Sequence, residues 1–106
     1  MRTDLTASAT ISPNSQPKLQ TFVRLQYDEA RQRWVLQAPE RVLVLDETSK
    51  EIVDLCTGDA SVGQIVDRLA GDYEDARDMI EHDVLAVLRL LADKNLLVFE
   101  QASGAE

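Results

Sequence analysis

The chain has 106 residues, a formal net charge of −8 at pH 7, and hydrophobic residues at 44% of its positions. This length allows one small domain with a modest core. The negative charge repels phosphate backbones, which argues against nucleic acid as a partner. All apolar runs are far shorter than the roughly 20 residues of a transmembrane helix, and the N-terminus lacks the apolar segment of a signal peptide. We therefore expect a cytoplasmic protein that does not enter a membrane.

The N-terminal stretch, residues 1–17, is rich in Ser, Thr, Asn and Pro and has no hydrophobic periodicity. This composition is typical of a disordered tail. We expect one ordered domain over residues 18–100 and a second polar tail over residues 101–106.

Three strands are predicted at the start of this domain. Phe22–Tyr27 alternates in side-chain polarity, which indicates a half-buried strand. Two apolar runs follow, Trp34–Leu36 and Arg41–Leu45, and a short connection that contains Pro39 joins them. We expect the three strands to form an antiparallel meander.

The third strand places Val42 and Val44 on one face and Leu43 and Leu45 on the other. If a neighbouring strand pairs with one side only, the other side is an open edge that no proline or lysine blocks. Another extended peptide can add itself as a strand to such an edge. The same edge also favours self-pairing, as a homodimer or a strand-swapped dimer.

Two short helices are predicted after the strands. Thr48 and Glu51 have the spacing of a capping box, and the helix that they begin should run to about Cys56. Ser61 and Gln64 repeat this pattern at the start of the second helix.

A third, longer helix is predicted over residues 76–94, capped by Asp75 and closed by Asn95 in the left-handed conformation. Leu96–Phe99 then has the composition of a short strand. The sequence therefore predicts an α+β fold similar to a winged helix-turn-helix: a three-stranded antiparallel meander, three helices and a short C-terminal strand. The expected buried stripe of the long helix consists of Ile80, Val84, Val87, Leu88 and Leu91.

No catalytic arrangement is evident in the sequence. His82 is the only histidine and Cys56 the only cysteine, so the usual metal-binding clusters lack ligands. We expect Cys56 and Trp34 to be core residues and His82 to be exposed. The carboxylates between Asp72 and Asp83 should be solvated and stabilise a helix start. We therefore expect a protein that is not an enzyme and that has no cofactor or metal site.

The order of the helices also fits a DNA-binding domain, in which the third helix would enter the major groove. That helix, however, carries more acidic than basic residues, whereas a DNA-reading helix is basic. A winged-helix transcription factor or protein-interaction adaptor is therefore the alternative function.

Four segments occur in a characteristic order: Leu36–Leu45, the helix from Thr48 that ends near Gly58, Ser61–Val66, and Asp83–Leu85 with Leu88. Together they resemble the pyrroloquinoline quinone (PQQ) biosynthesis protein D (PqqD) family. The resemblance covers residues 18 to 100, and the APERVLVL stretch is its most specific part. The chain departs from the family pattern in its longer N-terminal tail and at positions 46 and 95, where Asp and Asn replace Asn and Gly.

The resemblance implies a non-catalytic peptide chaperone of PQQ biosynthesis. Such a protein holds a PqqA-type precursor peptide and presents it to PqqE, a radical S-adenosylmethionine (SAM) enzyme. The peptide would add as a strand and lie in a groove between the third strand and the third helix. The expected peptide-binding residues of the strand are Arg41, Val42, Leu43, Val44 and Leu45. The expected groove wall on the helix consists of Val84, Leu88 and Leu91, and the helical spacing also permits Leu85 on one rim or Asp83 and Leu90 on the other.

Overall fold

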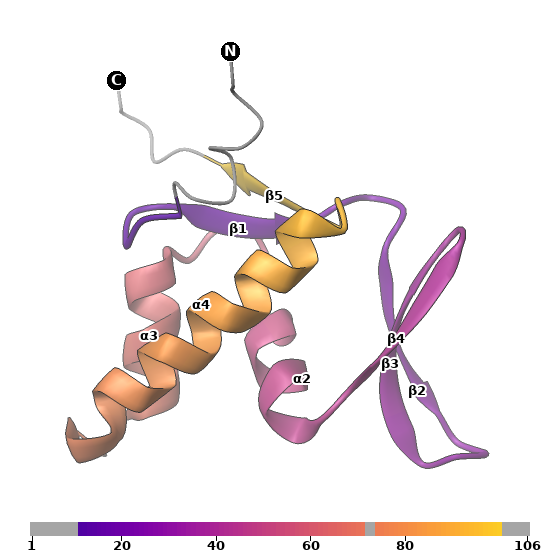
Figure 1. The fold of residues 1–106 in the computed structure, drawn as a ribbon, viewed down its shortest axis with the longest axis horizontal. Helices are drawn as coiled ribbons and strands as arrows, with labels where there is room; N and C mark the ends of the chain where they lie inside the picture. Colours follow the sequence, from indigo (N-terminus) through magenta and orange to yellow (C-terminus); the bar gives the residue numbers. More distant parts are fainter. Residues whose placement is uncertain (1–10, 72–73, 101–106) are drawn as a thin grey trace.

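The strands and helices of this chain, seen in a computed structural model, are described over residues 11–71 and 74–100. Two sheets lie on different sides of a group of three helices (Figure 1). One sheet has the strand order β2-β3-β4, and the other consists of β1 and β5. The elements in chain order are β1 (Gln16–Leu19), β2 (Arg24–Asp28), β3 (Arg33–Ala38), β4 (Arg41–Leu45), α2 (Glu47–Asp54), α3 (Val62–Ala70), a short 3-10 helix η1 (Glu74–Ala76), α4 (Arg77–Asp93) and β5 (Leu97–Glu100).

The three-stranded sheet is an antiparallel meander with β3 at its centre. Leu36 lies opposite Leu43, and Trp34 lies opposite Leu45, so these side chains share one face of the sheet. Leu36 and Leu45 on this face belong to the hydrophobic core. The opposite face carries the exposed Val42 and Val44. The predicted meander and the predicted alternation of the third strand are confirmed.

The β1–β5 pair closes the fold by joining the two ends of the described chain. Gln16 lies opposite Glu100, and Leu19 lies opposite Leu97. The predicted start of order at residue 18 is too late, because Gln16 is in this strand and Pro17 is fully buried. The composition of the segment gave no sign of its partner at the other end of the chain. Residues 1–10 and 101–106 of the predicted tails lie outside the described residues.

Helix α2 begins one residue before the predicted capping residue. Asp46 is its N-cap, and the Asp46 carboxylate accepts a hydrogen bond from the Ser49 backbone N–H at 2.8 Å. The predicted Thr48–Glu51 capping box is therefore wrong, because Asp46, the residue directly after β4, already occupies the cap position. The helix ends at Asp54, two residues before the predicted end at Cys56.

The predicted capping box of α3 is confirmed in both directions. Ser61 Oγ accepts from the Gln64 N–H at 3.1 Å, and the Gln64 side-chain oxygen accepts from the Ser61 N–H at 2.8 Å. The predicted cap of α4 is wrong, because Ala76 occupies the N-cap without a side-chain hydrogen bond and η1 leads directly into the helix. Asn95 closes α4 as predicted, with φ of 62°.

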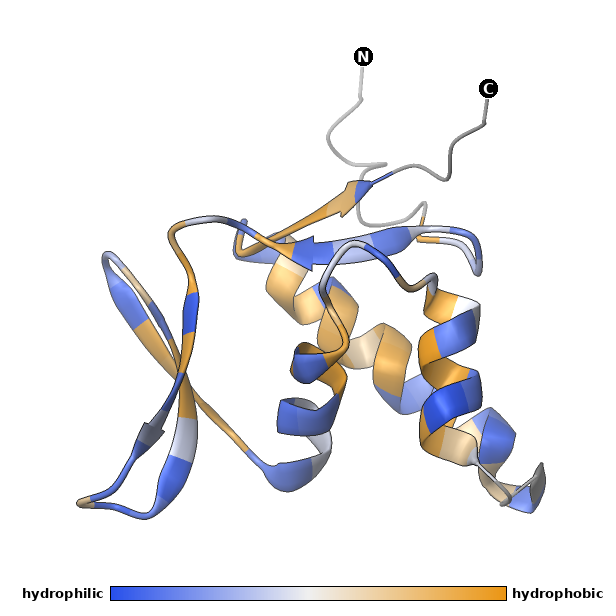
Figure 2. Ribbon diagram, turned by 180° about the vertical axis from the view of Figure 1, so that it is seen from behind, coloured by the Kyte–Doolittle hydropathy of each residue, from blue (hydrophilic) through white to orange (hydrophobic). Residues whose placement is uncertain are grey.

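The core lies where the three helices and the inner face of the sheet meet. Val84, Leu88 and Leu91 of α4 are fully buried in one cluster with Ile52 of α2 and Ile65 of α3. The predicted stripe of α4 is confirmed for these three residues, while Ile80 and Val87 are half-buried. In Figure 2, α3 and α4 carry both orange (hydrophobic) and blue (hydrophilic) segments, and α2 is mostly blue.

The α+β architecture, the three helices and the C-terminal strand are confirmed, and the similarity to winged helices stays a prediction. Among the helices of the described residues, none is both long and apolar enough to cross a membrane.

The cap of α2 can be tested by comparing Asp46→Ala with Thr48→Ala. We expect Asp46→Ala to lower the free energy of unfolding by about 1 kcal/mol, because it removes the hydrogen bond to the Ser49 N–H. Thr48→Ala should have a much smaller effect, since Thr48 is not the cap. Urea denaturation measures both, and a larger loss for Thr48→Ala would contradict the assignment.

The same contact predicts a dependence on pH. The hydrogen bonds from Ser49 hold the pKa of Asp46 below its ordinary value of 3.8. The stabilisation is thus fully present above pH 3.8 and is lost as the pH falls through the lower folded-state pKa. The difference in unfolding free energy between the wild type and Asp46→Ala should therefore shrink in acid. A difference that does not change with pH would contradict this expectation.

Candidate functional site

Strand β4 forms an edge of the three-stranded sheet. One side of β4 pairs with β3, and within residues 11–71 and 74–100 no strand pairs with its other side. Strand edges carry a row of backbone donors and acceptors that a second chain can use. The predicted open edge is therefore present in the described structure.

The hairpin geometry indicates which residues of β4 direct their backbone groups outward. A two-residue turn joins Ala38 to Arg41, which are opposite each other. A β-turn closes with a hydrogen bond between such residues, and hydrogen-bonded and non-hydrogen-bonded pairs then alternate along the ladder. Val42 and Val44 therefore present their N–H and C=O groups to the open edge.

The side chains of β4 divide between the surface and the core. Arg41 is exposed, and Val42 and Val44 are 55% and 54% exposed. Leu43 is half-buried, and Leu45 is part of the core. The open edge thus combines free backbone groups with two exposed apolar side chains and one cation.

The predicted contact residues of α4 have unequal access to solvent. Val84, Leu88 and Leu91 are enclosed in the core, because α2 and α3 cover this stripe of the helix. We predicted that a peptide contacts these three residues. Their burial corrects this prediction, because a peptide on the surface cannot reach them. Leu85 is half-buried and Asp83 is exposed, so these two remain available.

The helix that packs most closely on β4 is α2, and α2 in turn packs on α4. It lies between the sheet and the other two helices (Figure 1). A hollow of about 210 Å³ lies where α2, α3 and α4 meet. Its lining includes Glu51 of α2 and Asp83 of α4, with the buried Ile52 and Val84. Sequence reasoning missed Glu51 as a surface feature because it assigned this residue to a capping box.

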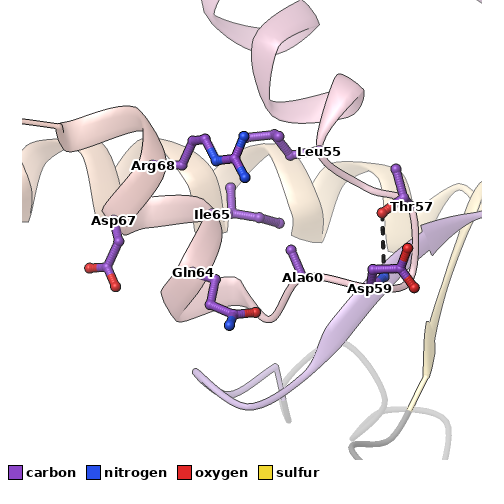
Figure 3. A pocket seen from close by; sticks show the side chains of 8 residues that line it. All are labelled: Leu55, Thr57, Asp59, Ala60, Gln64, Ile65, Asp67 and Arg68. Atoms are coloured by element: carbon purple, nitrogen blue, oxygen red, sulfur yellow. Dashed lines mark hydrogen bonds between the residues drawn. The ribbon is translucent and has the colours of Figure 1, made fainter.

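A larger hollow, of about 530 Å³, lies between the end of α2 and α3 (Figure 3). The Arg68 side chain extends beside Ile65 toward Leu55, and the Asp59 backbone N–H donates to Thr57 Oγ1 at 3.3 Å. None of these residues belongs to the predicted contact set. The lining of this larger hollow contains no cysteine or histidine, and no two of its residues are arranged as nucleophile and base.

Cys56 and Trp34 have structural roles, and the single histidine is on the surface. Cys56 is buried, and its Sγ donates to the Ile52 carbonyl at 3.3 Å, as expected for a core cysteine. Trp34 packs edge-on against Tyr27, with 5.1 Å between the ring centroids, and the Lys50 ammonium lies 4.6 Å from the Trp34 ring centroid. His82 is exposed. Among the described residues, no group of three or more His, Cys, Asp or Glu side chains is placed to hold a metal ion.

Residues 33–97 match the family model of the coenzyme PQQ synthesis protein D (PqqD). The chain belongs to the PqqD family. The matched region contains β3, β4 and all three helices, so it includes the open edge and both hollows.

Curated relatives extend the similarity over most of the chain. A PqqA binding protein of Bradyrhizobium diazoefficiens is 47% identical over 87 residues, which are 82% of this chain and 84% of the relative. A PqqA binding protein of Rhodopseudomonas palustris strain BisB5 is 49% identical over 95 residues, which are 90% of this chain and 93% of the relative.

Two solved structures of PqqD proteins are also similar. The solution structure of the PqqD truncation of Methylobacterium extorquens PqqCD has a TM-score of 0.72 and 36% identity, and the match covers 86% of this chain and 97% of that chain. That protein is a functional, stand-alone recognition element for ribosomally synthesized and post-translationally modified peptides. The crystal structure of Xanthomonas campestris PqqD has a TM-score of 0.50 and 41% identity, with 82% and 97% coverage.

Because Cys56 is buried in the core, its thiol should react slowly with thiol reagents. Burial raises the pKa of the Cys56 thiol to about 12 from an ordinary value of 9.0, so the native protein contains almost no thiolate at pH 8. We expect Ellman's reagent to react far more slowly with the native protein than with the urea-unfolded protein. Equal rates in both states would contradict the burial of the thiol.

The raised pKa also affects stability at high pH. Above pH 9 the unfolded chain loses the thiol proton, whereas the folded chain keeps it until about pH 12. The free energy of unfolding should therefore contain a component that is constant below pH 9 and falls as the pH rises toward 12. Urea denaturation of the wild type and Cys56→Ala over this range isolates the component.

Proposed function

We propose that this chain binds a PqqA-type precursor peptide by strand addition to β4 and presents it to the radical SAM enzyme PqqE. The observation that carries the proposal is the open edge of β4, with the outward backbone groups of Val42 and Val44. The relatives named PqqA binding protein support the identity of the peptide.

Backbone pairing would supply a large part of the affinity. Each main-chain hydrogen bond has a net value of about 0.5 to 1.5 kcal/mol, and Val42 and Val44 together offer up to four such bonds. Arg41 would attract an acidic residue of the peptide, and the exposed faces of the two valines would contact its apolar side chains. Asp83 and Leu85 lie on opposite rims of the buried stripe of α4, and one of these two rims would complete the proposed contact surface.

The proposed role needs no catalytic residue, cofactor or metal in this chain. A domain that holds and presents a substrate requires affinity and orientation, and the chemistry takes place in the partner enzyme. We place this activity in the cytoplasm, where a ribosomally made precursor is available. Self-pairing of β4, as a homodimer or strand-swapped dimer, would use the same backbone groups and would exclude the peptide.

Val44→Pro tests strand addition directly. Proline lacks a backbone N–H, and the Val44 N–H is directed to the open edge rather than to β3. We expect this substitution to weaken binding of the precursor peptide about five- to tenfold, as the loss of one hydrogen bond implies. Isothermal titration calorimetry with the synthetic precursor measures the change.

Val44→Ala is the matched control, because it removes the same side chain but keeps the amide. It should bind the peptide more tightly than Val44→Pro. Equal affinities for the two variants, with the hairpin intact by NMR, would show that the peptide does not pair with this edge.

A further inference from the structure

The hollow between α2, α3 and α4 lies close to the end of β4. β4 ends at Leu45, and α2 begins two residues later at Glu47. Thr48 and Glu51, on the first turns of α2, line the hollow, and Leu45 belongs to the same core cluster as the hollow's Ile52 and Val84. A peptide paired along β4 and continuing past Leu45 would therefore run toward the first turns of α2, which line this hollow.

The hollow has an apolar interior and two carboxylates. Ile52 and Val84 are fully buried, and Leu69 and Ile80 are half-buried. Glu51 and Asp83 are exposed and come from different helices. Its volume, about 210 Å³, holds several waters at about 30 Å³ each or one long side chain.

Neither carboxylate has a cation three or four residues away on its own helix. Side chains three or four residues apart are neighbours on a helix, and the residues at these spacings from Asp83 are Met79, Ile80, Ala86 and Val87. The corresponding neighbours of Glu51 are Glu47, Thr48, Asp54 and Leu55.

Three cations of the helices are engaged away from this hollow. Lys50 pairs with Asp54 at 2.7 Å, Arg77 pairs with Asp67, and Arg68 lines the other hollow. Among the described residues, no ion pair includes Glu51 or Asp83. Within the described part of the chain, no ion pair therefore neutralises these two carboxylates.

We propose that this hollow binds a lysine or arginine side chain of the precursor peptide, and this inference rests on the function proposed above. The aliphatic part of such a side chain packs on apolar surface while its charged end stays at the rim. Here the apolar interior receives the aliphatic part, and Glu51 and Asp83 bind the charged end.

The charges along the site then give the bound peptide a polarity. Strands β2, β3 and β4 contain Arg24, Arg33 and Arg41 against the single acid Asp28. Arg41 lies at the start of β4, and the acidic hollow lies beyond its end. A peptide with a basic residue at the hollow and an acidic or neutral residue near Arg41 is favoured over the reversed peptide. The hollow thereby contributes to the choice of precursor and to its register.

The test compares the double variant Glu51→Gln/Asp83→Asn with the control Glu47→Gln/Asp93→Asn. Both remove two negative charges, one from α2 and one from α4, and all four residues are exposed. The control residues do not line the hollow. The probe is the synthetic precursor peptide, together with versions in which each Lys or Arg is replaced by Gln. NMR spectra of each variant establish that it is folded.

We expect the double variant to weaken binding of the precursor about fivefold or more, and the control to leave the affinity within about twofold. One of the Lys or Arg replacements should weaken binding to the wild type to a similar extent. The same replacement should have little further effect on binding to the double variant, because the two changes remove the same contact. The difference in precursor affinity between the wild type and the double variant should also decrease at high salt, because salt screens the charges.

Three results would overturn the inference. If the double variant and the control have equal affinities while Val44→Pro weakens binding, the peptide pairs with β4 without using the hollow, and the proposed function stands alone. If the double variant weakens only the complex with the radical SAM enzyme, the hollow receives a basic group of that enzyme instead. If the wild type does not bind the precursor at all, the proposed function fails as well.

Discussion

The packing of the apolar stripe of α4 is the constraint on which the rest of the structure depends. Val84, Leu88 and Leu91 are the centre of a single core that α2, α3 and the inner face of the sheet complete. A helix with such a stripe must bury it, and α2, α3 and β5 pack on this helix. The position of α2 between the sheet and the other helices follows from this packing (Figure 1).

This constraint also determines what remains available for recognition. Because the most apolar residues of α4 are enclosed, the surface next to β4 presents mostly backbone groups, two valines and charged side chains. Backbone pairing does not discriminate between sequences, since every peptide carries the same main chain. Selectivity in such a site must come from charge and from pockets at its ends. In the proposed site, Arg41 and the acidic hollow would have this role.

The β1–β5 pair has a complementary role, because it joins the ends of the described chain across the helices. Leu96 and Leu97 are buried in the core, and Lys18 pairs with Glu100 at 3.8 Å on the surface. Both strands are only four residues long. Their stability thus depends on the helices beneath them, as short two-stranded pairs are marginal in isolation.

The features that the sequence by itself determined are those encoded within a few neighbouring residues. The alternation of β4, the capping box of Ser61 and Gln64, the apolar stripe of α4 and the left-handed Asn95 depend on short-range geometry, and all are present. Three features were decided only by the tertiary structure. Pro17 lies in a strand that pairs with the strand of Phe99, and the apolar stripe of α4 packs against other helices rather than lining a groove. Glu51 and Asp83, from different helices, line the same hollow. These outcomes depend on which distant surfaces meet in the folded chain, and a periodic pattern identifies an apolar face without identifying its neighbour.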